Sequence, residues 1–326
     1  GNRKIKTIYF GGGTPSIINN HHIEKIILQI KNKFKVHKLA EITLEVNPDD
    51  VSKKKLKSWK KIGINRISLG VQTFNKSLLK KLNRIHTKEV ALSAIDEIEK
   101  LYDNYSIDLM FGIPDSSKES VKRDLNILQK LDPPHVSIYN MTLEEKTVFY
   151  KLFKNNKISI PSEDSVLEQY DLILNLLESS GYENYEISNY AKKGYYSKHN
   201  SNYWKDEEYI GYGPSAHSYD GNYRYWNISD NKEYIKLIDQ SKMVFDREKL
   251  SLKEKVNEHI LTRIRTNSGV SQKELLERFD VDIMKEKADE IMLLEKEKLL
   301  RIDKKILTLT NKGKKLSDSI TEKITY

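Results

Sequence analysis

The feature that most constrains the fold is an alternation of short apolar segments and amphipathic segments along the first half of the chain. Each apolar segment ends in a glycine or polar loop, and helical periodicity follows it. We predict strands at Ile5–Phe10, Glu41–Val46, Ile64–Val71, Ser106–Phe111 and Val136–Tyr139. Because parallel strands need helical crossovers, the alternation predicts consecutive βαβ units in a parallel sheet or barrel. In such folds the loops at the carboxyl ends of the strands carry the chemistry.

Helical periodicity fills the intervals between these strands. Ile23, Ile26, Ile27 and Ile30 form one apolar stripe, and Lys76–Leu101 contains further helical segments. Ser116 and Glu119 have the spacing of a capping box, so we expect a helix to begin there.

The last part of the chain has a different pattern. Ser251–Arg265 reads as a helix, a second helix follows a Ser271 and Glu274 cap, and Ile283–Lys296 is a third. Leu299–Asp303 and Ile306–Leu309 then form a hairpin. This order predicts a small winged-helix-like α domain, so we divide the chain into residues 1–248 and residues 249–326.

Composition excludes several classes of protein. The 326 residues contain no cysteine, which excludes disulfides, thiolate metal sites and cysteine nucleophiles from this sequence. No apolar run approaches the roughly 18–20 residues of a membrane span, so we expect a cytoplasmic protein. The net charge of +9 comes from lysines scattered among acidic residues. This pattern is typical of solvated helix faces, and we do not expect a nucleic-acid partner.

The first loop of the repeat runs from Gly11 to Ser16 with the sequence GGGTPS. Three glycines let a ligand approach the backbone, and turned N–H groups can hold a carboxylate or a phosphate. A tight turn without a ligand would explain the same residues equally well.

Polar residues also mark the next three strand ends. Glu45 lies at the end of the second strand, Gln72 ends the third with Arg84 twelve residues later, and Asp108 lies inside the fourth. A carboxylate in an apolar strand needs a partner, which is either a ligand or a structural ion pair. Because parallel strands end at one edge, four polar strand ends together predict a ligand site.

A further segment follows the repeats. It reads His199-Asn200-Ser201-Asn202-Tyr203-Trp204, and Gly211 to His217 follow with the sequence GYGPSAH. A histidine close to Tyr203 and Trp204 suits imidazole ligation of iron beside a flat aromatic surface. A satisfied loop or core histidine is the alternative that these residues leave open.

Together these motifs resemble one family, and they occur in this order: GGGTPS, EVNP, GVQ with RIH downstream, IDLMFGIP, HNxxYW and GxGxSAH. That family is the radical S-adenosylmethionine family around oxygen-independent coproporphyrinogen III oxidase, and the similarity is greatest to its heme-chaperone branch. The resemblance covers essentially the whole chain. It implies an α/β fold, namely a TIM-like (β/α) radical-SAM barrel followed by the small C-terminal domain.

The resemblance also implies roles for single residues. By motif, Gly12, Gly13 and Thr14 would hold the methionyl part of S-adenosylmethionine. The residues that would contact its other groups are Glu45, Gln72, Arg84 and Asp108, with Thr142 and His217 as weaker transfers. HNxxYW is associated with heme binding in the chaperone branch. It implies His199 as the axial iron ligand, in a heme site with Asn200, Tyr203 and Trp204.

The chain departs from this family at one point. The family binds a 4Fe-4S cluster through a CxxxCxxC motif on the loop after the first barrel strand, whereas this sequence starts at the GGGTP strand and has no cysteine. Either an N-terminal portion is absent from the sequence or the cluster has been lost. We expect the first, with an incomplete barrel that lacks its first strand and cluster ligands outside this chain.

The expected function is a heme chaperone that binds heme and passes it to an unidentified acceptor protein. The alternative is a radical-SAM oxidoreductase, the oxygen-independent coproporphyrinogen III oxidase of porphyrin biosynthesis. HNxxYW argues against this alternative, and whether the protein is an enzyme is left open. Nucleic-acid binding through the C-terminal domain is a third class, which the many acidic residues there disfavour.

Overall fold

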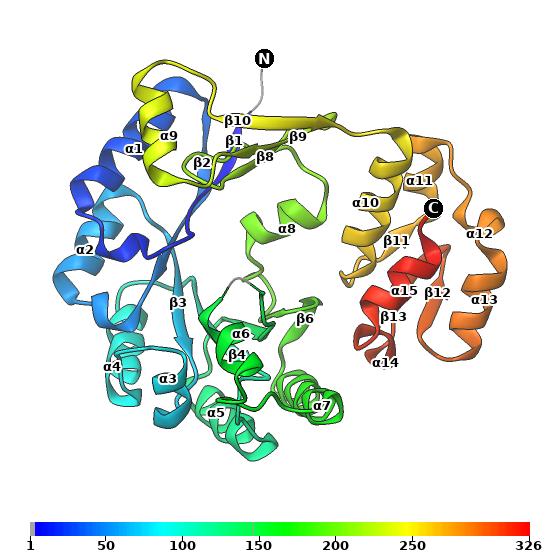
Figure 1. The fold of residues 1–326 in the computed structure, drawn as a ribbon, viewed down its shortest axis with the longest axis horizontal. Coiled ribbons are helices and arrows are strands. Elements are labelled where there is room, and N and C mark those ends of the chain that lie inside the picture. Colours follow the sequence, from blue (N-terminus) through cyan, green and yellow to red (C-terminus); the bar gives the residue numbers. More distant parts are fainter. Residues whose placement is uncertain (1–3, 146) are drawn as a thin grey trace. The chain divides into compact units, whose positions relative to one another are not determined.

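The computed structural model describes residues 4–145 and 147–326. It divides into two compact units, Gly1–His199 and Asn200–Tyr326, which are described separately below (Figure 1). The predicted boundary at residue 248 lies inside the second unit, within strand β10 (Phe245–Lys249). The assignment of a separate domain to residues 249–326 stays a prediction.

The first unit is built on a curled seven-stranded sheet with the order β1-β2-β3-β4-β5-β7-β6. The first five strands are parallel and lie in sequence order, and β7 is antiparallel to both β5 and β6. The strands are β1 (Ile5–Phe10), β2 (Val36–Val46), β3 (Arg66–Gln72), β4 (Tyr105–Phe111), β5 (His135–Asn140), β6 (Glu183–Glu186) and β7 (Asn189–Ala191). The five predicted strands and their parallel order are therefore confirmed.

Helices cover the outer face of this half-barrel (Figure 1). The helices that pack on the sheet are α1 (Asn20–Lys33), α2 (Lys53–Ile62), α4 (Lys88–Glu99), α5 (Lys118–Leu131) and α7 (Glu163–Ser179). Two shorter helices, α3 (Lys76–Lys81) and α6 (Val148–Lys154), follow β3 and β5 in sequence. The capping box before α5 was predicted one residue too early. It is formed by Ser117 and Ser120, because Ser116 already belongs to a turn in which its N–H donates to Ile113.

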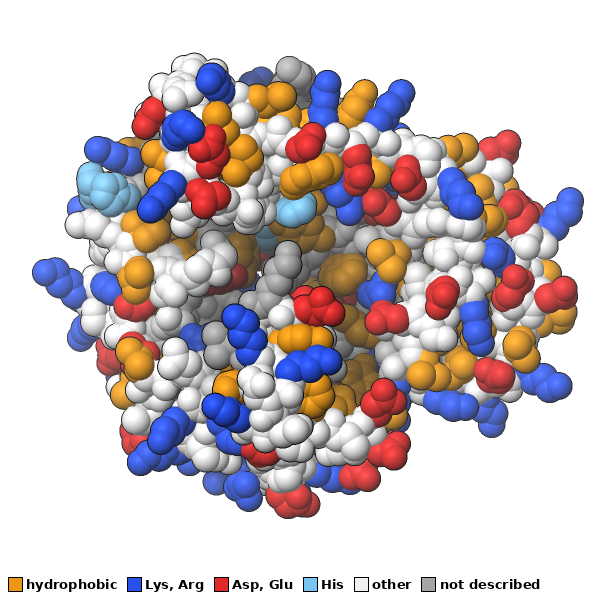
Figure 2. All heavy atoms as spheres, viewed as in Figure 1, with side chains coloured by type: hydrophobic (Ala, Val, Ile, Leu, Met, Phe, Trp, Pro, Cys, Tyr) orange, Lys and Arg blue, Asp and Glu red, His pale blue; other side chains and the backbone are white. Residues whose placement is uncertain are grey.

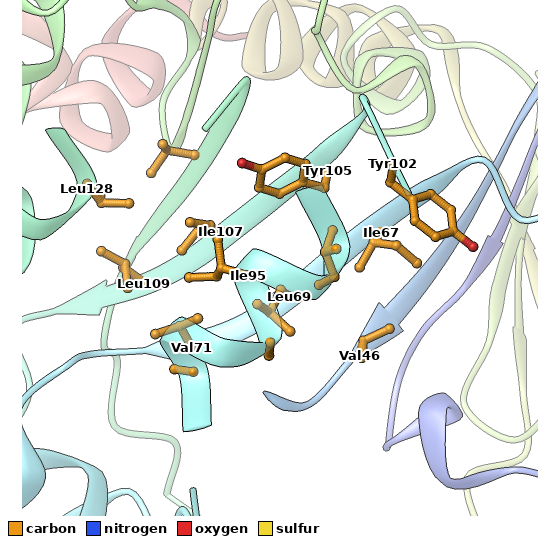
Figure 3. Packing of buried hydrophobic residues seen from close by; sticks show 14 of the residues in the cluster. Val46, Ile67, Leu69, Val71, Ile95, Tyr102, Tyr105, Ile107, Leu109 and Leu128 are labelled. Carbon is orange, nitrogen blue, oxygen red and sulfur yellow. The ribbon is translucent and has the colours of Figure 1, made fainter. Parts of the chain in front are cut away.

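Alternation within the parallel strands separates apolar from polar side chains. On the outer face Ile67, Leu69 and Val71 of β3 lie beside Ile107 and Leu109 of β4 (Figure 3). Burying one such side chain stabilises the fold by about 1.5–3 kcal/mol. The alternate positions form the inner face and are mostly polar: Thr7, Tyr9, Glu41, Thr43, Glu45, Arg66, Ser68, Ser106, Asp108, His135, Ser137 and Tyr139. The inner face of the half-barrel is therefore a polar surface.

The second unit contains two small antiparallel sheets. The first has the order β10-β9-β8, formed by β8 (His217–Tyr219), β9 (Tyr223–Asn227) and β10, and helix α9 (Asn231–Asp239) lies between β9 and β10 in sequence. The second has the order β11-β13-β12 and accompanies the C-terminal helices. Helix α8 (Lys198–Trp204) starts at the end of the first unit.

After Ser251 the structure contains the predicted first two helices, the hairpin and a final helix, together with β11 and α14, which were not predicted. The elements in order are α10 (Leu252–Ile264), β11 (Val270–Ser271), α11 (Gln272–Phe279), α12 (Ile283–Glu286), α13 (Ala288–Lys296), β12 (Leu300–Asp303), β13 (Ile306–Leu309), α14 (Asn311–Lys314) and α15 (Ser317–Ile324). The third predicted helix is broken at Lys287, whose φ of −121° and ψ of 30° are not helical. Helices beside a three-stranded sheet that contains the β12–β13 hairpin agree with the predicted winged-helix-like pattern.

No helix among the described residues is long and apolar enough to cross a membrane. On the face drawn in Figure 2, Lys and Arg side chains are scattered among Asp and Glu side chains and do not gather over one element.

Candidate functional site

Glu45 connects the glycine loop to strand β1. Its Oε1 accepts a hydrogen bond from the Tyr9 hydroxyl at 2.8 Å, and its Oε2 accepts one from the Gly12 N–H at 3.1 Å. Burial raises the pKa of Glu45, and these two hydrogen bonds oppose the rise. Burial and the neighbouring carboxylates also raise the pKa of Tyr9, so the phenol stays a donor at neutral pH. The structure therefore places Gly12 and Glu45, predicted from separate motifs, in one site.

The glycine loop leaves its backbone open. Gly12 has φ of +105°, which favours glycine, and a Cβ built on Gly12 or Gly13 would meet no atom within 4 Å. Thr14 follows and lines a cavity of about 450 Å³ together with Asn47 and Arg84. Arg84 Nη1 donates to Asn47 Oδ1 at 2.8 Å, so the EVNP and RIH motifs also meet here.

Gln72 is the last residue of β3, and Asp108 lies in the middle of β4. Gln72 has φ of +67° at a bulge in β3, and its Nε2 would lie 3.0 Å from a Cβ on Gly70. Gly70 pairs with Asp108 across the two strands. The side-chain amide of Gln72 therefore lies next to Gly70, the residue that pairs with Asp108 on the neighbouring strand.

Two serines that the sequence motifs did not indicate hold Asp108. Ser68 Oγ donates to Oδ2 at 2.6 Å and Ser106 Oγ donates to Oδ1 at 3.0 Å. Burial raises the pKa of Asp108, and these hydrogen bonds oppose the rise. Glu45 and Asp108 together give the inner face two acceptors suited to an ammonium group or a hydroxyl.

His199 lies against β1 and β2. The carboxylate of Glu41 accepts the first N–H groups of helix α8, from Lys198 at 3.2 Å and from His199 at 3.0 Å. A carboxylate at this position satisfies backbone donors and complements the helix dipole. Glu41 is only 3% exposed, so the start of α8 is fixed to the sheet by a buried group.

The His199 ring has two defined neighbours. Its Nδ1 lies 2.9 Å from the Thr7 hydroxyl, and its ring stacks on Tyr9 with centroids 4.7 Å apart and planes inclined by 19°. Burial lowers the pKa of His199 to about 4, so its imidazole is neutral at neutral pH. Thr7, Tyr9 and Glu41 were missed by motif reasoning. The signal for them was the polar alternation in β1 and β2, which gives these residues one shared face.

The remaining predicted residues lie elsewhere in the chain. Thr142 is exposed in the loop after β5, and His217 is exposed at the start of β8. Asn200, Tyr203 and Trp204 continue helix α8 into the second unit, where Tyr203 is 43% exposed and packs edge-on against Tyr209 at 4.8 Å. Their predicted roles in cofactor and heme binding stay predictions.

Known proteins share both parts of this architecture. Residues 1–128 match the family model of the radical SAM superfamily, and residues 250–316 match that of the HemN C-terminal domain. The solved structure of coproporphyrinogen III oxidase (HemN) from Escherichia coli covers 99% of the chain with a TM-score of 0.84, and the chain covers 78% of that structure. At 23% sequence identity this likeness concerns the fold alone. Fold and motifs thus define a radical SAM protein with a HemN-type C-terminal domain.

Two curated relatives narrow this class. The heme chaperone HemW of Lactococcus lactis is 36% identical over 321 residues, which are 98% of this chain and 84% of the relative. The heme chaperone HemW of Bacillus subtilis is 34% identical over 323 residues, which are 98% of this chain and 85% of the relative. The chain belongs to the HemW family.

Membership of the radical SAM superfamily implies S-adenosylmethionine and a 4Fe-4S cluster as cofactors. The open glycine loop and the carboxylates of Glu45 and Asp108 fit the amino acid and hydroxyl groups of the first. The cluster is different. These 326 residues contain no cysteine and offer no thiolate for it, so no step is derived through it.

Proposed function

We propose that this protein is a heme chaperone that coordinates heme iron through His199 and passes heme to an acceptor protein. The observation that carries the proposal is the placement of His199 on a helix whose first N–H groups are held by the buried Glu41. The names of the HemW relatives support the same function.

The chemistry of His199 suits an iron ligand. Iron binds neutral imidazole, and burial keeps the pKa of His199 near 4, far below physiological pH. Its Nδ1 lies 2.9 Å from the Thr7 hydroxyl, so we propose Nε2 as the nitrogen that coordinates iron. A hydrogen bond at the other ring nitrogen is the usual way in which proteins orient a ligating histidine. Heme would supply the iron and the flat porphyrin, and the chain would supply the oriented base.

The rest of the motif has a proposed role in holding the porphyrin. Helix α8 carries Tyr203 and Trp204 four and five residues after His199. Aromatic rings offer the apolar surface that a porphyrin plane needs, and a half-exposed Tyr203 is accessible to one. Asn200 is proposed as the polar neighbour of the iron ligand.

Heme titration tests the proposal. Heme is added to the wild type and to His199→Ala, and the Soret band is followed to saturation. We expect a Soret band typical of histidine ligation in the wild type and its loss in His199→Ala, with affinity at least about tenfold lower. His22→Ala is the matched control, because His22 is exposed on α1. Equal spectra and equal affinity in wild type and His199→Ala would remove His199 as the ligand.

Delivery is tested separately. Heme-loaded protein is mixed with the apo form of a heme protein, and transfer is followed by the change from one Soret spectrum to the other. Transfer faster than from free heme supports a chaperone, and retention of heme contradicts it. The acceptor in the cell and the expected cytoplasmic location stay predictions.

S-adenosylmethionine is proposed to bind at Gly12, Gly13, Thr14, Glu45, Gln72, Arg84 and Asp108, with Thr142 and His217 as further contacts. The grouping of the first seven along adjoining strand ends supports this assignment. The alternative function, oxygen-independent coproporphyrinogen III oxidase, is supported by the fold likeness alone. We therefore prefer the chaperone.

A further inference from the structure

One chain of contacts joins the two predicted sites. The His199 ring stacks on the Tyr9 ring with centroids 4.7 Å apart. The Tyr9 hydroxyl donates to Glu45 Oε1 at 2.8 Å, and Glu45 Oε2 accepts from the Gly12 N–H at 3.1 Å. All four residues belong to the first unit. Tyr9 is thus in direct contact with the proposed iron ligand and with the carboxylate of the glycine-loop site.

The strand register explains why these residues meet. In the parallel pair of β1 and β2, Thr7 pairs with Glu41 and Tyr9 pairs with Thr43. Residues at alternate positions share one face, so Thr7, Tyr9 and Glu45 all point to the inner side. Thr7 contacts the Nδ1 atom of His199, and Glu41 accepts its backbone N–H. Tyr9 stacks on the face of the imidazole ring.

We propose that Tyr9 is a positioning residue that couples Glu45 to His199. Loss of the Glu45 charge, or of its hydrogen bond with Tyr9, then lowers the affinity of His199 for heme. This inference rests on the proposed ligation of heme by His199. The hydrogen bond to Glu45 fixes the rotation of the phenol, and the phenol plane fixes the orientation of the imidazole. A hydrogen bond to a carboxylate is stronger than one between neutral groups. Its removal should therefore let the Tyr9 ring rotate away from its position against the imidazole.

A double-mutant cycle tests this coupling. The variants are Tyr9→Phe, Glu45→Gln and the double variant, and each is titrated with heme alongside the wild type and His199→Ala. Tyr9→Phe keeps the stacked ring and removes the donor, whereas Glu45→Gln keeps the shape of the acceptor and removes its charge. We expect each single variant to bind heme about three- to tenfold more weakly, and the double variant to bind no more weakly than the singles. The ligand-field bands of the ferric complex should shift in the same non-additive way.

The outcomes separate the coupling from the function. Additive effects in the double variant, or an unchanged heme affinity in Glu45→Gln, overturn the coupling and leave heme ligation intact, provided that His199→Ala still loses the Soret band. An unchanged His199→Ala overturns the ligand and the coupling together.

A second measurement guards against a folding defect. Tyr139→Phe changes another inner-face tyrosine, on β5, and should combine additively with Glu45→Gln. Melting temperatures of all variants within a few degrees of the wild type show that the fold is kept.

Discussion

Glu41 accepts the backbone N–H of His199 at 3.0 Å across 158 residues of sequence. The same carboxylate accepts the N–H of Lys198 at 3.2 Å, so a strand residue caps helix α8 from outside the helix. Capping normally comes from the residue just before the helix. Here the cap fixes both the start of the helix and the histidine in its first turn to strand β2.

Glu41→Gln should therefore weaken heme binding. The amide keeps an acceptor but loses the charge that complements the helix dipole, and a lost cap costs about 0.5–2 kcal/mol. We expect heme affinity to fall by about three- to tenfold and the α8 amide protons to exchange faster. Heme titration and hydrogen exchange of α8 measure both effects. Glu24→Gln, on the exposed face of α1, is the control and should change neither.

Thr7→Val should disturb the ring nitrogen of His199 without changing side-chain volume. The hydroxyl at 2.9 Å from Nδ1 is lost, and with it a contact that fixes the orientation of the proposed iron ligand. We expect about threefold weaker heme binding and a broadened Soret band.

Thr43→Val is the matched control for Thr7→Val. Thr43 is fully buried on the neighbouring strand β2, and its hydroxyl has no hydrogen-bond partner among the described residues. Its replacement should leave heme binding unchanged and should not lower the melting temperature. Equal heme affinities for Thr7→Val and Thr43→Val would contradict the proposed role of Thr7.

The sequence predicted those parts of the fold in which local pattern and global structure agree. Strands β1 to β5 combine an apolar run with a glycine or polar end, so each could be recognised alone. Strands β6 and β7 could not, because ENYE and NYA contain mostly polar and aromatic residues. They form by pairing, β7 with β5 and β6 with β7.

The candidate site divides in the same way. Gly12 belongs to a glycine run after β1, and Glu45 and Asp108 are carboxylates within apolar strands, so all three are visible in the sequence. Thr7 and Glu41 are ordinary strand residues there, because their role depends on the pairing of β1 with β2 and on a helix 192 residues after Thr7. The alternation in β1 and β2 indicates which face Thr7 and Glu41 share, but their contacts with His199 are set by tertiary structure.

Asp206→Asn should destabilise the second unit. Asp206 Oδ2 lies 2.6 Å from His259 Nδ1 and 3.1 Å from Arg278 Nη1, and His259 is 1% exposed. Asn keeps the left-handed backbone of residue 206, where φ is +54°, so the change isolates the loss of charge. Replacing a hydrogen-bonded carboxylate whose cationic partner Arg278 is partly exposed costs about 1–3 kcal/mol. Calorimetry should show a lower melting temperature, whereas Asp303→Asn, exposed on β12, should leave it unchanged.

Acid should weaken the same cluster. Burial opposes ionisation of Asp206, but the hydrogen bond and charge of His259 outweigh it and hold the pKa of Asp206 below its ordinary value. A carboxyl group whose pKa is lowered by folding stabilises the fold above its unfolded pKa, near 4, and loses that contribution as pH falls further. The melting temperatures of wild type and Asp206→Asn should therefore converge below about pH 4. A constant difference down to pH 2 would show that the charge of Asp206 is not the cause.

Glu186 should have the opposite pH dependence. It is 2% exposed, and burial raises its pKa to about 7, although the N–H of Ser188 donates to it at 3.2 Å. The folded state therefore binds more protons than the unfolded state between about pH 4.5 and 7, so the free energy of unfolding falls as pH rises through this range. The rise of the pKa from 4.5 to about 7 limits the loss of unfolding free energy to on the order of 3 kcal/mol.

Glu186→Gln removes the ionisable group. The free energy of unfolding of this variant should therefore be nearly independent of pH from 5 to 8 and should exceed that of the wild type at pH 8. Urea denaturation at several pH values measures this, with Glu183→Gln, an exposed carboxylate of the same strand, as the control. If the wild type loses no more stability than Glu186→Gln between pH 5 and 8, Glu186 ionises in the folded protein without the burial cost inferred for it.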